Sequence, residues 1–201
     1  MKIFYKYIII AVLMCIPYLL VLADLRLLDN GVNKFSLTGV SHSVFLLINL
    51  YLIFRLGKSK PELRNGIYLI FGLFLCMLIR ENREMIRTIT DKQLHWAWLA
   101  WPAAIIFCVA GFRKPGKAWS DLKALTYIPD YNFFIAGVLI ILVWSRLIGN
   151  RFLWMFAAGD NYMGVLKNTA EEPTQSAGYL LCISGLIFMT YRYFQQDKKS
   201  E

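Results

Sequence analysis

Apolar runs long enough to cross a membrane recur through the 201-residue chain and are separated by short polar stretches. An α-helix rises about 1.5 Å per residue, so roughly 17–25 apolar residues span the hydrocarbon core of a bilayer. Apolar residues make up 58% of the sequence and charged residues 17%. Soluble domains are usually about 45–50% apolar. The runs therefore predict an all-α, polytopic membrane protein.

The apolar runs predict six transmembrane helices arranged as three hairpins, in one integral membrane bundle over residues 1–201. The predicted helices cover residues 7–23, 39–56, 66–87, 93–112, 131–149 and 174–194. Between the first two, residues 24–38 contain Asp24, Asp29 and an Asp-Asn-Gly turn signal, which indicates a linker. Residues 113–123 form a basic loop in this scheme.

The net charge of +9 comes from 22 Lys and Arg against 13 Asp and Glu. These basic residues are spread over short loops beside the apolar runs and form no basic domain, which argues against nucleic acid as a partner. Most of them fall on the side of the bundle that holds both termini. The positive-inside rule then places both termini in the cytoplasm, in a bacterial-type inner (plasma) membrane.

The stretch over residues 80–95 concentrates mixed charge between two apolar runs. On one helix, four of its charged residues fall within an arc of roughly 100°: Arg80, Arg83, Glu84 and Arg87. Arginine binds phosphate bidentately, so we expect these arginines, with Arg146 and Arg151, to hold the phosphate of a lipid or of a lipid-linked sugar. The alternative is that the arginines snorkel to ordinary headgroups and that Glu84 pairs with Arg80 and Arg87 at helical spacing.

Histidines and acids collect on the predicted outer side and give candidates for catalysis. The candidate catalytic residues are His42, His95, Glu81 and Glu84, and an acidic cluster accompanies them: Asp91, Asp160, Glu171 and Glu172. Imidazole nitrogens and carboxylates suit general acid–base chemistry and also suit zinc or another divalent metal, which is the candidate cofactor. No H-E-x-x-H spacing is present, so the predicted topology alone assembles this group.

Helix capping is the alternative explanation for two of the acids. Thr90 and Gln93, like Thr169 and Glu172, have the spacing of a capping box. That spacing would place Asp91 and Glu171 in the first turns of helices, where the helix dipole favours acids.

A weak internal repeat relates the second helices of the three predicted hairpins. His42 lies twelve residues before Phe54, and His95 twelve before Phe107. Ser176 precedes Phe188 by the same interval. If the repeat is real, His42 and His95 lie at matching depths near the outer surface.

Together these patterns predict an outward, periplasm-facing polar pocket at the membrane surface. We expect it to bind or handle a phosphate-bearing lipid or lipid-linked substrate, with membrane lipids as its partners. A first alternative is a membrane-embedded lipid hydrolase or transferase that uses histidine and acidic residues, with or without a metal. A second alternative is a non-catalytic subunit that assembles with another membrane protein.

Overall fold

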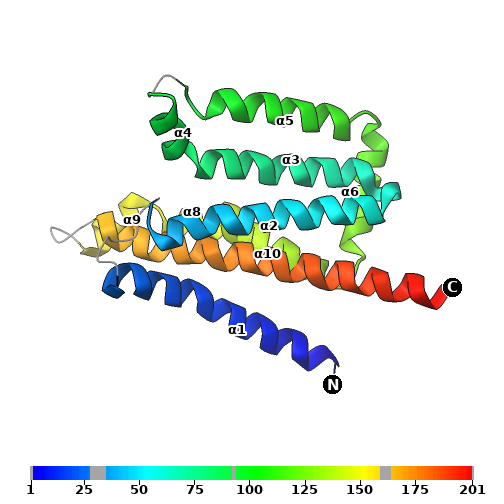
Figure 1. The fold of residues 1–201 in the computed structure, drawn as a ribbon, viewed down its shortest axis with the longest axis horizontal. Coiled ribbons are helices and arrows are strands. Elements are labelled where there is room, and N and C mark those ends of the chain that lie inside the picture. Colours follow the sequence, from blue (N-terminus) through cyan, green and yellow to red (C-terminus); the bar gives the residue numbers. More distant parts are fainter. Residues whose placement is uncertain (1, 28–34, 92–93, 159–163, 201) are drawn as a thin grey trace. The chain divides into compact units, whose positions relative to one another are not determined.

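The computed structural model describes residues 2–27, 35–91, 94–158 and 164–200, and every element in these ranges is helical (Figure 1). Four of the described helical stretches are long and apolar enough to cross a membrane: Phe4–Leu27, Leu37–Ser59, Pro61–Glu81 and Tyr131–Ile148. A fifth candidate is the pair Ala97–Gly111 and Pro115–Thr126, which is bent by 93°. The all-α class is therefore confirmed for the described residues, and several of their helices are long and apolar enough to span a membrane. Six spans in three hairpins are not confirmed.

The helices follow one another with few breaks. In chain order they are α1 (Lys2–Leu22), the π-helix η1 (Ala23–Leu27), α2 (Leu37–Ser59), the 3₁₀ turn η2 (Pro61–Leu63), α3 (Arg64–Glu81), α4 (Arg83–Ile89), α5 (Ala97–Gly111), α6 (Pro115–Thr126), α7 (Tyr131–Leu139), the π-helix η3 (Ile140–Trp144), α8 (Ser145–Ile148), α9 (Arg151–Ala158) and α10 (Gly164–Ser200). Both π-helical segments continue an α-helix directly, η1 after α1 and η3 after α7.

The predicted helix over residues 66–87 is interrupted at Asn82. There the backbone leaves the helical region (φ −87°, ψ 18°), and the Asn82 side-chain amide donates to the Leu78 carbonyl at 2.9 Å. Asparagine competes for backbone partners in this way and so ends α3. The predicted continuous helix is therefore wrong.

Three further boundaries differ from the predicted ones. The helix predicted over 93–112 begins at Ala97, because Thr90 ends α4 and does not cap α5. Gln93, the other half of that capping box, lies outside the described residues. The predicted basic loop is instead the helix α6, and the last helix begins at Gly164 rather than at residue 174.

The chain divides into two compact units, and each is described by itself. The first unit comprises Met1–Phe45 and Ile135–Ser184. In it α7 and α10 pack closely at two glycines. A Cβ atom added to Gly137 would lie 2.6 Å from the Gly178 carbonyl oxygen, and one added to Gly178 would lie 2.5 Å from the side chain of Ile141. Only residues without a side chain fit at this crossing.

The second unit comprises Leu46–Phe134 and Gly185–Glu201. Here α3 and α5 run side by side (Figure 1), with a Cβ at Gly72 lying 2.5 Å from Phe107. Helix α6 supplies a cap for α3, because one carboxylate oxygen of Asp121 accepts the backbone N–H groups of Asn65 and Gly66, at 3.1 and 3.3 Å.

Buried polar side chains are divided unequally between the units. Of the twelve buried polar or charged residues among those described, Asn49 and Asp121 belong to the second unit. The other ten belong to the first: Asp24, Ser36, Thr38, His42, Ser145, Glu171, Glu172, Gln175, Ser176 and Ser184. Burying polar groups is unfavourable unless they are hydrogen-bonded, so this concentration directs attention to the first unit.

Candidate functional site

Asp24 connects η1 to the start of α2. It is fully buried, and its two carboxylate oxygens accept the backbone N–H groups of Leu37 and Thr38, each at 2.8 Å, and the Thr38 hydroxyl at 2.5 Å. The first N–H groups of a helix have no partner within the helix, and a carboxylate there also interacts favourably with the helix dipole. Asp24 therefore caps α2 from another segment, and its predicted place in a linker is wrong.

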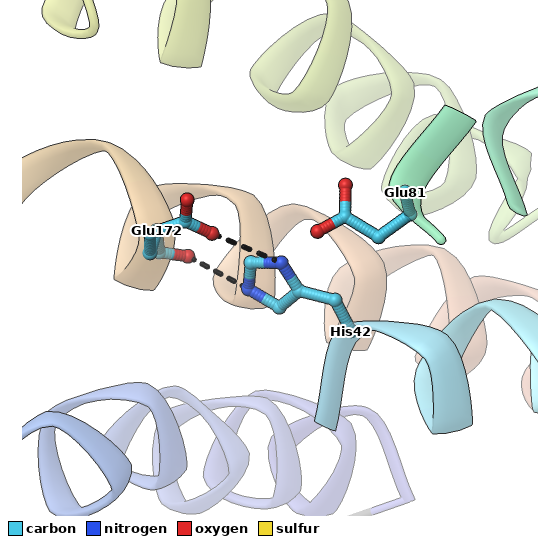
Figure 2. Close-up of side chains that lie close together, drawn as sticks. All are labelled: His42, Glu81 and Glu172. Carbon is cyan, nitrogen blue, oxygen red and sulfur yellow. Dashed lines mark hydrogen bonds and ion pairs between the residues drawn. The ribbon is translucent and has the colours of Figure 1, made fainter. Parts of the chain in front are cut away.

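His42, one helical turn beyond Thr38, reaches across to α10 (Figure 2). Its Nδ1 lies 3.3 Å from a carboxylate oxygen of Glu172, and its Nε2 lies 3.0 Å from the Glu172 carbonyl oxygen and 2.7 Å from the Ser176 hydroxyl. The Tyr179 ring meets the imidazole edge-on, with the centroids 5.4 Å apart. His42 and Ser176 are fully buried.

The oxygens around the His42 ring limit the forms that the ring can take. The Glu172 carboxylate and carbonyl only accept hydrogen bonds, whereas the Ser176 hydroxyl can donate or accept. An imidazolium ring donates to both sides. A neutral ring with its proton on Nδ1 donates to the carboxylate and can accept from Ser176. In either form Glu172 orients the ring.

Glu171, the neighbour of Glu172, binds two cations and an amide. Its carboxylate lies 2.8 Å from Arg146, 3.3 Å from Lys167 and 3.0 Å from the side-chain amide of Gln175. The close approach requires Gly149, since a Cβ there would overlap the Glu171 carboxyl group. The amide oxygen of Gln175 is buried without a hydrogen-bond partner among the described residues.

An apolar cavity of about 790 Å³ lies in the same unit. Both π-helical segments line it, η1 through Leu25 and η3 through Ile140 and Trp144. Pro17 of α1 and Pro173 of α10 form other parts of its wall. π-Helical turns occur frequently at functional sites, and here two of them face one cavity.

Helix α10 contributes to the cavity wall, to the contacts of His42 and to the ion pairs of Glu171. At 100° per residue, the cavity residues Thr169, Pro173, Thr174 and Ala177 occupy one side of the helix. Lys167 and Glu171 lie beyond one edge of that side, Ser176 and Glu172 lie beyond the other, and Gln175 lies on the opposite side of the helix. We call Glu171 with Arg146, Lys167 and Gln175 the Glu171 group, and His42 with Glu172 and Ser176 the His42 group. Lys167 and Glu171 flank the cavity on one side, and Ser176 and Glu172 flank it on the other.

The predicted arginine arc is not formed as expected. Arg80 belongs to α3, whereas Arg83, Glu84 and Arg87 belong to α4, beyond the break at Asn82. Within α4, Arg83 and Arg87 each pair with Glu84, at 3.4 and 3.7 Å, and all three side chains are exposed or half-exposed. The alternative explanation is therefore confirmed for Glu84 and Arg87, which are three residues apart, whereas Arg83 is the adjacent residue in the sequence.

Four other predicted site residues belong to neither the Glu171 group nor the His42 group. His95 is exposed, and its Nδ1 accepts the backbone N–H of Ala97 at 3.3 Å. Asp91 is exposed with a positive φ of 47° and lies in no helix, and Arg151 is the exposed first residue of α9. Glu81 is the half-buried last residue of α3.

Both predicted capping boxes are wrong, since Thr90 ends a helix and Thr169 lies inside α10. Asp160 lies outside the described residues. In the first unit His42 and Glu172 supply one nitrogen and one carboxylate, whereas four ligands are usual for zinc, and the divalent metal stays a prediction.

Sequence reasoning missed four residues of this site: Asp24, Lys167, Gln175 and Ser176. Two signals were available. Lys167, Glu171 and Gln175 recur every fourth residue, and Ser176 holds the position in the weak repeat that His42 holds in its own helix.

Comparison with known proteins finds no matching family model, no matching curated protein and no matching solved structure.

Proposed function

We propose that the protein binds or handles a phosphate-bearing lipid, or a lipid-linked substrate, in the first unit. The observation that carries this proposal is the apolar cavity of about 790 Å³ flanked by the Glu171 group. Apolar walls suit an acyl or polyprenyl chain, and a small number of polar groups at the border of a pocket fixes the headgroup.

The charges of the Glu171 group suit a phosphate. Arg146 and Lys167 share the single carboxylate of Glu171, which leaves one net positive charge for the phosphate of a lipid. The two cations have 39% and 30% of their side chains exposed, against 10% for the Glu171 side chain. A ligand can therefore reach the cations while the acid stays covered.

The proposed setting is a bacterial-type inner membrane, crossed six times with both termini in the cytoplasm. In this orientation the Glu171 group and the cavity lie towards the periplasmic surface. Trp144 lines the cavity and precedes Arg146 by two residues. Tryptophan and arginine are both favoured at the level of lipid headgroups, which supports this placement.

Binding of fluorescent dioleoyl phosphatidic acid to the purified protein in neutral detergent tests the proposal. Arg146→Gln should weaken binding about five- to tenfold, because a charge-assisted bond to phosphate is lost. Glu171→Gln keeps the shape of the side chain but removes the competing anion, so it should strengthen binding several-fold. A merely structural role would move both variants in the same direction.

Arg26→Gln is the matched control, since Arg26 is exposed in the same unit and contributes to neither the Glu171 group nor the cavity wall. Equal binding by all three variants and the unaltered protein would exclude this site.

A second candidate function is a lipid hydrolase or transferase. It is favoured by the chain of contacts in which the Glu172 carboxylate meets one nitrogen of His42 and the Ser176 hydroxyl meets the other. A hydroxyl within hydrogen-bond distance of an imidazole that a carboxylate orients is the arrangement of an activated serine nucleophile. Ser176→Ala should abolish release of fatty acid from a fluorescent phospholipid and also labelling by a fluorophosphonate. Ser184→Ala is the control, because Ser184 is buried on the same helix and donates to the Leu180 carbonyl. Equal turnover by both variants would argue against this function.

A further inference from the structure

In the second unit, Arg64 and Tyr68 form a ridge along α3. The Arg64 Nε–H donates to the Tyr68 hydroxyl at 2.5 Å, and the guanidinium carbon lies 5.2 Å from the centroid of the Tyr68 ring. These contacts hold the arginine against the helix surface. Both residues line two separate grooves, of about 660 and 510 Å³. The ridge therefore divides one groove from the other.

The two grooves are mainly apolar. The larger one lies against α5, with Ile105, Ile106 and Val109 in its wall. The smaller one has Phe54 and Phe71 in its wall. In the larger groove the three α5 side chains are each more than half exposed, and Ile106 is 63% exposed. Such contiguous apolar surface on a membrane protein suits hydrocarbon chains.

Basic residues stand at the ends of both grooves. Arg113 lines the larger groove, Lys58 lines the smaller one, and Arg64 stands between them. The nearby acids already have basic or backbone partners, since Asp121 accepts the first N–H groups of α3 and Glu62 lies 3.6 Å from Lys60. The ridge with its two grooves therefore has a positive end and an apolar body.

We infer that this ridge binds a diacyl anionic phospholipid, with the phosphate on Arg64 and one acyl chain in each groove. Arginine suits the phosphate because its fork of N–H groups matches the oxygens. Two grooves on either side of a single headgroup contact match the two chains of such a lipid. Basic pockets between membrane helices are known as sites for anionic headgroups. The site shares no residue with the one in the first unit and does not depend on it.

The test uses the full chain, stripped of lipid in neutral detergent, and native mass spectrometry with two probes, dioleoyl phosphatidylglycerol and dioleoyl phosphatidylcholine. The unaltered protein should retain the first probe more tightly. The double variant Arg64→Gln with Arg113→Gln should weaken binding of phosphatidylglycerol by about 10- to 30-fold, since each basic residue near a headgroup contributes on the order of tenfold or less. Binding of phosphatidylcholine should change little.

The control is Lys114→Gln with Lys117→Gln, which removes the same charge from two exposed residues that line neither groove. An equal loss in this control, or equal binding of the two probes, would overturn the inference. The single-chain lysophosphatidylglycerol should bind more weakly than the two-chain lipid, and equal affinity would refute the role of two grooves.

Ile106→Trp provides a second variant that keeps all charges and narrows the larger groove, and it should also lower affinity. In an Arg146→Gln background, which removes the phosphate contact proposed for the first unit, Arg64→Gln with Arg113→Gln should still weaken binding of phosphatidylglycerol, so failure at one site is distinguishable from failure at the other.

Discussion

Replacing Asp24 by asparagine should strongly destabilise the first unit, although the two side chains have nearly the same shape. The carboxylate accepts one hydrogen bond from Leu37 on one oxygen and two from Thr38 on the other, and the Ser36 side chain adds a further hydrogen bond. An asparagine has a single oxygen. Whichever way the amide is turned, its NH₂ group must face at least one N–H group, and two donors then lie opposite each other in a fully buried place.

The magnitude follows from the bonds that remain. With its oxygen facing Thr38, the substituted side chain keeps two bonds without their charge and loses the bond to the Leu37 N–H. A hydrogen bond to a charged group contributes about 1.5–3 kcal/mol, and a buried donor without a partner costs about 1–3 kcal/mol. These two figures describe much of the same loss, so Asp24→Asn should lower the free energy of unfolding by about 2–4 kcal/mol.

Equilibrium unfolding in mixed detergent micelles measures this change, and a double-mutant cycle with Thr38→Val tests its cause. The valine removes the Thr38 hydroxyl but leaves its backbone N–H. If the hydroxyl bond to Asp24 is real, the two substitutions should be non-additive, with a coupling of about 1 kcal/mol. Asp91→Asn is the control, because Asp91 is exposed with a positive φ that asparagine tolerates well. A loss below about 0.5 kcal/mol for Asp24→Asn would refute this account, since that is the range of surface substitutions.

Two other substitutions test the packing of each unit. Gly137→Ala should lower the free energy of unfolding by about 1–3 kcal/mol, because the new Cβ would lie 2.6 Å from the Gly178 carbonyl oxygen. Gly116→Ala, where no atom lies within 4 Å of the new Cβ, should have no such effect in the same unfolding assay. Asp121→Ala removes the cap on α3 and should cost about 0.5–2 kcal/mol. Faster hydrogen exchange at Asn65 and Gly66 would confirm it, and unchanged exchange at both amides would contradict it.

Hydropathy predicted the helical class and the approximate positions of the apolar helices, because a long apolar run in lipid must satisfy its own backbone hydrogen bonds. It failed where helices are short or polar. Helix α6 was expected to be a loop, since Lys117 and Lys123 make the stretch basic. Its buried residues Ala118 and Leu125 are seven positions apart, which is the spacing of one helix face. The break at Asn82 depends on one side-chain hydrogen bond, which hydropathy does not register.

The candidate site was predicted in part. His42, Arg146, Glu171 and Glu172 were all proposed from the sequence, but the sequence could not show which partner each one has. His42 bonds to residues 130 and 134 positions away along the chain, so only the packing of α2 against α10 brings them together. The capping explanation of Glu171 was wrong for a related reason. It assumed that a helix begins near Thr169, whereas α10 begins at Gly164 and places Glu171 well inside the helix.

The contrast between α4 and α10 shows where a functional test is most informative. In α4, Glu84 pairs with arginines that are nearly half exposed, and exposed pairs of this kind contribute about 0.2–1 kcal/mol. In the first unit the carboxylates of Asp24, Glu171 and Glu172 are buried, and each has its own set of donors.

A buried ion pair is often no more stabilising than apolar residues of the same volume, so helix packing alone does not account for the ion-paired carboxylates of Glu171 and Glu172. Asp24 has a structural purpose as the cap of α2. Glu171 and Glu172 lie inside α10, beyond the two edges of its cavity side. The proposed binding of a ligand would explain both buried carboxylates, and Glu171→Gln is the substitution that separates this explanation from a role in stability alone.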